Sequence, residues 1–137
     1  MAETLSTGFC LRLAGAYATL TARLDKALGA HHGIGFADYR LLLELQRAED
    51  GRLGREELAR RLGLPVAGAL RLLLPLEKIG LVTRAAGVAA LTPAGAELVG
   101  NATVVVDNVS RYALGNYGRP QLEETSGLLE RIAAGPR

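Results

Sequence analysis

Basic side chains are concentrated in one segment of this chain. Residues 52–84 contain seven basic and three acidic side chains, a net charge of +4, whereas residues 1–51 and 85–137 each carry −1. The basic side chains of the segment are Arg52, Arg55, Arg60, Arg61, Arg71, Lys78 and Arg84. A localised positive field favours phosphate binding, because each phosphate that is neutralised releases condensed counterions. The charge pattern indicates nucleic-acid binding, and the alternative is a solvated Arg-rich surface that binds nothing.

Glycine and proline divide this basic segment into short elements. Residues 56–62 contain helix-forming side chains with apolar residues on one face, which predicts a helix. Gly63-Leu64-Pro65 predicts a tight turn, because glycine permits the turn and proline presets the start of a second helix over residues 66–79. Gly80 suits the left-handed position that follows the end of such a helix.

A short hairpin is expected after the second helix. Residues 81–84 and 88–91 predict two strands, and Ala85-Ala86-Gly87 connects them. The order helix, turn, helix, hairpin is that of a winged helix-turn-helix. In that arrangement the second helix lies on the surface, where it can enter a major groove with the hairpin beside it.

Helices are expected on both sides of this unit. Apolar residues recur at three- and four-residue spacing from about Leu5 to Leu28, which predicts a long first helix that ends in the break from Gly29 to Gly35. Another helix is expected between this break and the basic segment, and it ends near Asp50-Gly51. Thr92-Pro93 is typical of a helix start, because a capping hydroxyl precedes a proline in the first turn. A last helix is expected from Gln121 to Ala133.

The composition favours a mainly α fold. The chain has 137 residues, 49% of them hydrophobic, with six aromatic residues and no tryptophan, which favours helices packed through aliphatic side chains. We expect one domain over residues 1–137, with a winged-helix core at residues 30–92. The helices at 5–29 and 93–134 carry apolar faces that this small core does not need. We therefore expect them to join two copies in a two-fold dimer.

Other classes of protein are not indicated. There is no Gly-rich phosphate loop, nucleophile elbow or pair of catalytic carboxylates, so we expect no enzyme, no catalytic residue and no cofactor. The adjacent imidazoles of His31 and His32 do not predict a metal site, because no Cys, Asp or Glu cluster completes one. A single cysteine, a start unlike a signal peptide and the lack of an 18-residue apolar run predict a cytoplasmic protein without a membrane partner.

With this order of elements the chain resembles the MarR family of bacterial transcriptional regulators over nearly its whole length. Four stretches in the same order carry the resemblance: GIGFADYRLL at residues 33–42, ELARRLGL at 57–64, LEKIGLV at 76–82 and LTPAG at 91–95. The resemblance implies a homodimer that represses transcription by binding double-stranded DNA. It also implies release by a small effector, often an aromatic acid, or by oxidation of a cysteine.

The resemblance also implies which residues face DNA. They are Arg60, Arg61, Ala67, Leu70, Arg71 and Arg84. Family members usually have Ser or Thr in the first turns of the second helix, where this chain has Pro65, Ala67 and Leu70, and their hairpin loop is longer and charged. Missing hydrogen-bonding groups predict weak DNA binding with little selectivity. The alternative is a winged-helix protein that has lost base recognition and serves as a ligand-binding or protein-interaction module.

Position in the family implies an effector pocket between the dimer helices and the winged helix. Its expected residues are Tyr17, His31, Phe36, Tyr39 and Arg40, and the alternative for the two tyrosines is packing in the core. Cys10 lies in the first helix, as does the sensing cysteine of the peroxide-responsive members. A lone cysteine is more often an inert buried residue, so we expect Cys10 to be dispensable.

Overall fold

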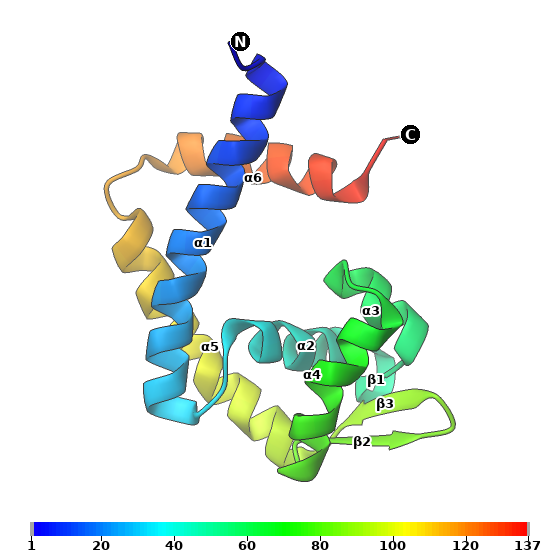
Figure 1. Ribbon diagram of the computed structural model, residues 1–137. Coiled ribbons are helices and arrows are strands. Elements are labelled where there is room, and N and C mark those ends of the chain that lie inside the picture. The colour runs from blue at the N-terminus through cyan, green and yellow to red at the C-terminus, as the bar shows by residue number, and fades with distance from the viewer. Residues whose placement is uncertain (1, 137) are drawn as a thin grey trace.

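The computed structural model describes residues 2–136 and is mainly helical (Figure 1). Over these residues it has six α-helices, a short 3₁₀ turn and a sheet of three strands. In chain order the elements are α1 (Leu5–His32), α2 (Phe36–Arg47), the turn η1 (Glu49–Gly51), β1 (Arg52–Gly54), α3 (Arg55–Leu62), α4 (Val66–Lys78), β2 (Val82–Ala85), β3 (Val88–Leu91), α5 (Pro93–Leu114) and α6 (Arg119–Ala134). None of the described helices is both long and apolar enough to span a membrane. The predicted winged helix-turn-helix with flanking helices is confirmed.

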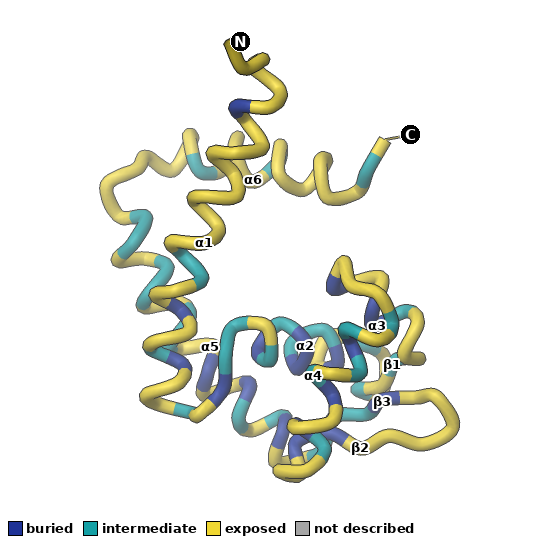
Figure 2. The backbone as a smooth tube through the Cα atoms, in the orientation of Figure 1, coloured by how far each residue is buried: buried dark blue, intermediate teal, exposed yellow. Residues whose placement is uncertain are grey.

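The helices α2, α3 and α4 and the sheet form the winged-helix unit at one end of the molecule (Figure 1). The long helices α1 and α5 run side by side from this unit, and α6 crosses the other end of the pair (Figure 1). The N-terminal half of α1 therefore projects away from the winged-helix unit. This half of α1 and the whole of α6 are mostly exposed, whereas the winged-helix unit holds most of the buried residues (Figure 2).

The core is formed mainly by leucines. Its fully buried side chains are Leu28, Leu41, Leu42, Leu45, Leu58, Leu73, Val82 and Val99. They come from α1, α2, α3, α4, β2 and α5, so one core joins the winged-helix unit to the base of the long helices. A buried leucine contributes roughly 1.5–3 kcal/mol relative to an exposed one, which makes this cluster the main source of stability.

The sheet has one strand more than the sequence predicted. β1 pairs antiparallel with β3, and Leu53 lies opposite Ala89, so the strand order is β1-β3-β2. Three residues are too few to show an alternating pattern, and pairing with β3 makes this segment a strand. The hairpin between β2 and β3 turns at Ala86 and Gly87, whose φ angles of 51° and 78° suit a two-residue turn of the type that right-twisted strands favour.

Three predicted boundaries were wrong. α1 continues to His32, because Gly29 and Ala30 remain helical and the left-handed residue that ends the helix is Gly33, with φ of 68°. His31 and His32 consequently lie in the last turn of α1 and not in a loop. α2 ends at Arg47 before the 3₁₀ turn, and α6 begins at Arg119, two residues earlier than expected.

Thr92 fixes the start of α5 against the end of α4. Its side-chain oxygen accepts a hydrogen bond from the backbone N–H of Gly95 at 3.0 Å, the capping interaction that the sequence predicted. The same hydroxyl donates to the carbonyl oxygen of Gly80 at 2.7 Å. One side chain thereby ties the first turn of α5 to the residue that ends α4.

Gly95 should be intolerant of a side chain. An added Cβ would collide with the carbonyl oxygen of Leu81 and lie 2.7 Å from Cδ1 of Leu91. We expect Gly95→Ala to lower the free energy of unfolding by about 1–3 kcal/mol, the usual cost of overpacking, in urea denaturation followed by circular dichroism.

Gly100→Ala is the matched control, since it adds the same methyl group to the same helix. No described atom lies within 4 Å of the Cβ it would add, so we expect a gain of roughly 0.5–1 kcal/mol. Equal effects of the two substitutions would contradict the close approach of α5 to Leu81.

Candidate nucleic-acid interface

A short turn sets the angle between α3 and α4. Gly63 ends α3 with a φ of 70°, and its N–H donates to the carbonyl oxygen of Arg60 at 3.1 Å. The N–H of Leu64 donates to the carbonyl oxygen of Ala59 at 2.9 Å, and α4 begins directly after Pro65. The predicted tight turn is therefore present, and it places α4 on the surface of the winged-helix unit beside the hairpin (Figure 1).

The two faces of α4 have different roles. Ala69, Leu73 and Leu76 are buried in the core. Ala67, Arg71, Leu74 and Lys78 are exposed, and Leu74 keeps half of its surface in solvent. The exposed face thus offers two cations and little else that could form hydrogen bonds, as the sequence predicted. Leu70 is only half exposed and packs against the core, so it is less available to DNA than expected.

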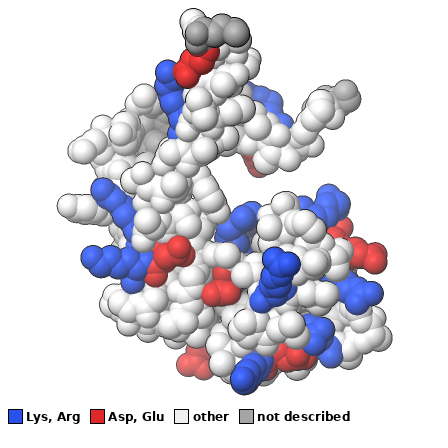
Figure 3. All heavy atoms as spheres, in the orientation of Figure 1, with Lys and Arg blue, Asp and Glu red and all other residues white. Residues whose placement is uncertain are grey.

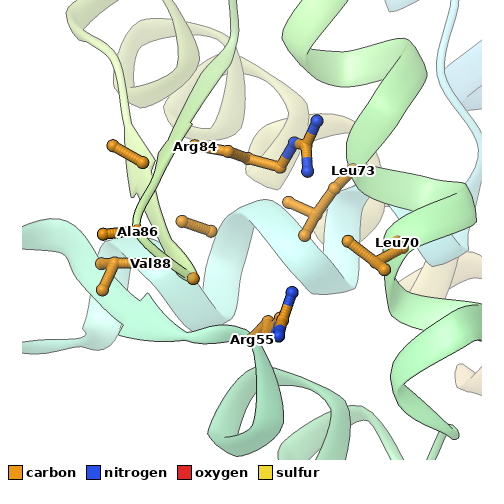
Figure 4. Close-up of a pocket in the computed structure, with 9 residues that line it drawn as sticks. Arg55, Leu70, Leu73, Arg84, Ala86 and Val88 are labelled. Carbon is orange, nitrogen blue, oxygen red and sulfur yellow. The ribbon is translucent and has the colours of Figure 1, made fainter.

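A cavity of about 140 Å³ lies between α4 and the hairpin (Figure 4). Leu70 and Leu73 line it from α4, and Val88 lines it from the hairpin. The side chains of Arg55 and Arg84 reach into it from the start of α3 and from β2 (Figure 4). Two guanidinium groups therefore lie in the gap between the two elements that a winged helix presents to DNA.

Arg84 links the hairpin to α4. Its Nε and Nη2 donate to Oε1 of Glu77 at 3.2 and 3.1 Å, and both side chains are about one-third exposed. This pair holds β2 against the end of α4. The charge of Arg84, which the sequence assigned to DNA, is balanced by Glu77 within the chain.

Arg60 and Arg61 share one carboxylate. Arg60 donates to Glu57 through Nε at 3.0 Å and also through Nη2, and Arg61 donates to the same carboxylate through Nε at 3.0 Å. These hydrogen bonds, Arg60 first and then Arg61, lower the pKa of Glu57, and Glu57 raises the pKa of Arg60. Arg61 also lies 3.6 Å from Glu44 of α2. Both arginines were predicted to bind DNA, and both are paired with carboxylates of the same chain.

Four other cations of this unit have no such partner. No ion pair to Arg52, Arg55, Arg71 or Lys78 forms among residues 2–136. Arg55 was counted in the basic segment but was not among the residues expected to face DNA, because its position depends on the fold: its backbone N–H donates to the carbonyl oxygen of Gly87 at 2.9 Å, which brings α3 to the hairpin tip. The pairing of Glu57 with residues three and four positions later, by contrast, follows from helical spacing alone.

The five residues expected to form an effector pocket do not come together. Tyr39 is buried, its ring stacks on Phe36 with a centroid distance of 6.1 Å, and its hydroxyl lies 2.8 Å from Oγ1 of Thr103. Tyr17 and His31 are both exposed on α1, where 14 residues of rise separate them by about 21 Å. Arg40 is half-buried on α2. Tyr39 is thus a core residue, the alternative left open by the sequence, and Tyr17 lies too far from His31 to share one small pocket with it within a single copy.

A larger hollow lies elsewhere, between α1, α5 and α6. It measures about 520 Å³, and its lining includes Leu20, Leu114, Leu122 and Tyr117, with Arg23 as the one charged side chain contributed by residues 2–136. It therefore combines an apolar lining with one cation.

The projecting helices expose many apolar side chains. The large ones are Leu5, Phe9, Leu11, Leu13 and Tyr17 on α1 and Leu128, Leu129 and Ile132 on α6. Within the described chain α6 has no buried residue at all, and Leu128, Leu129 and Ile132 therefore have no core to pack into within one copy. Cys10 lies on the same part of α1 and is exposed, contrary to the buried position expected for an inert cysteine.

The surface of the winged-helix unit carries charges of both signs (Figure 3). Basic groups stand beside acidic ones on the face in view, in agreement with the ion pairs of Arg60, Arg61 and Arg84. The described residues contain no group of three or more His, Cys, Asp or Glu side chains that could hold a metal ion.

Comparison with known proteins agrees with this geometry. A family model described as winged helix-turn-helix DNA-binding matches residues 37–83. No curated protein matches the chain.

Several solved structures share the fold over nearly its whole length. A MarR family transcriptional regulator from Streptomyces coelicolor, solved in complex with DNA, is 25% identical with a TM-score of 0.81, covering 98% of this chain and 89% of that one. A MarR family protein from Mycobacterium tuberculosis, also in complex with DNA, is 27% identical with a TM-score of 0.72, covering 96% and 98%. CouR from Rhodococcus jostii, bound to p-coumaroyl-CoA, is 23% identical with a TM-score of 0.84 and covers 99% of each chain. The chain therefore contains a winged helix-turn-helix DNA-binding domain, and it shares the architecture of MarR family transcriptional regulators over nearly its whole length.

Proposed function

We propose that this protein is a homodimeric repressor that binds double-stranded DNA in the cytoplasm and responds to a small molecule. The observation that carries the DNA-binding part is the placement of Arg71 on the exposed face of α4 and of Arg55 beside the hairpin tip. Neither guanidinium has a carboxylate partner in the described chain. Both are free to meet phosphates on either side of a groove entered by α4.

The dimer is supported by the apolar surface of α1 and α6. An amphipathic helix gains stability only when its apolar face is covered, and no residue of α6 is buried within one described copy. A two-fold dimer through these helices would bury that surface. It would also present two α4 helices to a site with two-fold symmetry.

The response to a small molecule is supported by the hollow between α1, α5 and α6. Its volume of about 520 Å³ falls in the range of ligand sites, and Arg23 at its edge suits an acidic group on an otherwise apolar ligand. CouR, which has the same fold, binds an aromatic thioester. For this chain we propose an apolar or aromatic acid as the ligand class.

Substitution of the unpaired arginines should weaken DNA binding. We expect Arg55→Ala and Arg71→Ala each to reduce affinity for the protein's own promoter fragment and to lower the slope of log K against log salt by about 0.9, the value for one lost phosphate contact. The measurement is fluorescence anisotropy at four salt concentrations. Arg111→Ala on α5, which removes an exposed arginine outside the winged-helix unit, is the control and should change neither quantity. An unchanged slope in the Arg55→Ala, Arg71→Ala double variant would contradict this placement of DNA.

Selectivity for one sequence should be low. Ala67 and Leu74 on α4 and Ala85, Ala86 and Gly87 at the hairpin carry no side-chain donor or acceptor that could read a base. We expect the promoter fragment to bind less than about a thousandfold more tightly than a scrambled duplex at the same salt concentration, below the usual range of specific binders.

Ala67→Ser should raise this selectivity, because a hydroxyl on the exposed first turns of α4 can form a hydrogen bond with a base edge. Selectivity above about ten-thousandfold in the wild type would contradict the inference that α4 and the hairpin lack side chains that read bases. Negligible DNA binding by both proteins would favour the alternative, in which exposed Leu74 and Ile79 contact another protein.

The protein should sediment as a dimer at micromolar concentration, with a mass near twice the 14.4 kDa of one chain. Ile132→Asp places a charge on the exposed apolar face of α6 and should shift the protein to the monomer. Ile79→Asp is the matched control, since Ile79 is also an exposed isoleucine but lies at the end of α4, and it should leave the dimer intact. A monomeric wild type would contradict the proposed assembly.

A further inference from the structure

Glu57 lies at the centre of a three-residue cluster on α3. Its carboxylate accepts hydrogen bonds from Arg60, through Nε at 3.0 Å and through Nη2, and from Nε of Arg61 at 3.0 Å. One oxygen of the carboxylate serves both arginines. A single negative charge therefore engages two of the seven basic side chains of the segment 52–84.

Helical spacing and the helix dipole both favour this cluster. Arg60 and Arg61 follow Glu57 by three and four positions, which places all three side chains on one strip of the helix. Glu57 lies in the first turn of α3 and the arginines lie in its last turn, the positions at which each charge is favourable. The hydrogen bonds from Arg60 and then from Arg61 also lower the pKa of Glu57, which favours its ionised form.

The cluster lies next to the end of α4 that would approach DNA. The carbonyl oxygen of Arg60 accepts the N–H of Gly63, in the turn that leads directly into α4. In a helix-turn-helix the N-terminal end of the second helix meets the bases, and the first helix crosses the phosphate backbone. The last turn of α3 is thus close to phosphates, and the guanidinium groups there are already occupied by Glu57.

We propose that Glu57 acts as an internal competitor for DNA phosphate, holding Arg60 and Arg61 and so limiting the affinity of this protein for any duplex. The inference rests on the proposed DNA binding. The carboxylate of Glu57 occupies N–H donors of both arginines and neutralises part of their positive charge, so each arginine attracts a phosphate less strongly while it is paired. The competition depends on charge and not on base sequence, and it therefore acts mainly on non-specific binding.

Arg60 is the arginine that removal of Glu57 would release. Its side chain is 73% exposed and, among the residues described, Glu57 is its one acidic partner. The side chain of Arg61 is 36% exposed and also lies 3.6 Å from Glu44, which would retain it. Loss of the Glu57 charge should therefore add about one phosphate contact and not two.

Glu57→Gln tests the proposal directly, with Glu56→Gln as the matched control. Glu56 is the neighbouring exposed residue, and no cation pairs with it in the part of the chain described, so both changes remove one charge from the same turn. Titration with a mixed-sequence duplex at low salt should show about three- to tenfold tighter binding for Glu57→Gln than for Glu56→Gln. One new phosphate contact should also raise the salt slope by about 0.9.

A second substitution distinguishes competition from a purely structural role of the cluster. The Glu57→Gln, Arg60→Ala double variant should lose the gain made by Glu57→Gln alone, because the guanidinium that Glu57→Gln would release is then absent. If the cluster only stabilises α3, Glu57→Gln will lower the melting temperature without tightening DNA binding, and the proposal is then wrong. If the wild type binds DNA and the two Gln variants bind it with equal affinity, this inference alone is overturned. If no variant binds DNA, the proposed function is overturned together with it.

Discussion

Burial of the leucines of α2 is the interaction on which the rest of the structure depends. Leu41, Leu42 and Leu45 are fully buried, and α2 contacts α1, α3, α4, α5 and the sheet. Because interiors are close-packed, the positions of these neighbours are fixed by the shape of one short helix. The angle at which α4 stands on the surface, and its distance from the hairpin, follow from this packing.

Some of the basic side chains of the winged-helix unit are paired within the chain and others are not. Arg60, Arg61 and Arg84 are paired with Glu57 and Glu77, whereas Arg55 and Arg71 have no carboxylate partner among residues 2–136. Four of the seven basic side chains of residues 52–84 are therefore ready to meet phosphates, and three are already paired. Exposed ion pairs contribute little to stability, so their main effect here is on how strongly the surface attracts DNA.

The two ends of the molecule differ in how they achieve stability. The winged-helix unit buries its apolar side chains within one copy, while α6 and the first half of α1 leave theirs exposed (Figure 2). Helices with exposed apolar faces are stable when another surface covers them. In the proposed dimer, folding of these helices and assembly would be coupled, and the spacing of the two α4 helices would depend on the same contacts.

Much of the fold could be predicted from the sequence because local geometry determines it. Gly63 and Pro65 define the turn before α4, and Thr92 with the proline after it defines the start of α5, since each residue type favours a particular backbone conformation. Helical periodicity also predicted that the exposed face of α4 is apolar. The same periodicity could have predicted the ion pairs of Glu57 with the arginines three and four positions later. The strand β1, the pairing of the Tyr39 hydroxyl with Thr103 and the place of Arg55 at the hairpin tip could not. These features join residues far apart in the chain, and their pairing is decided only when α2 packs and brings α3, the sheet and α5 together.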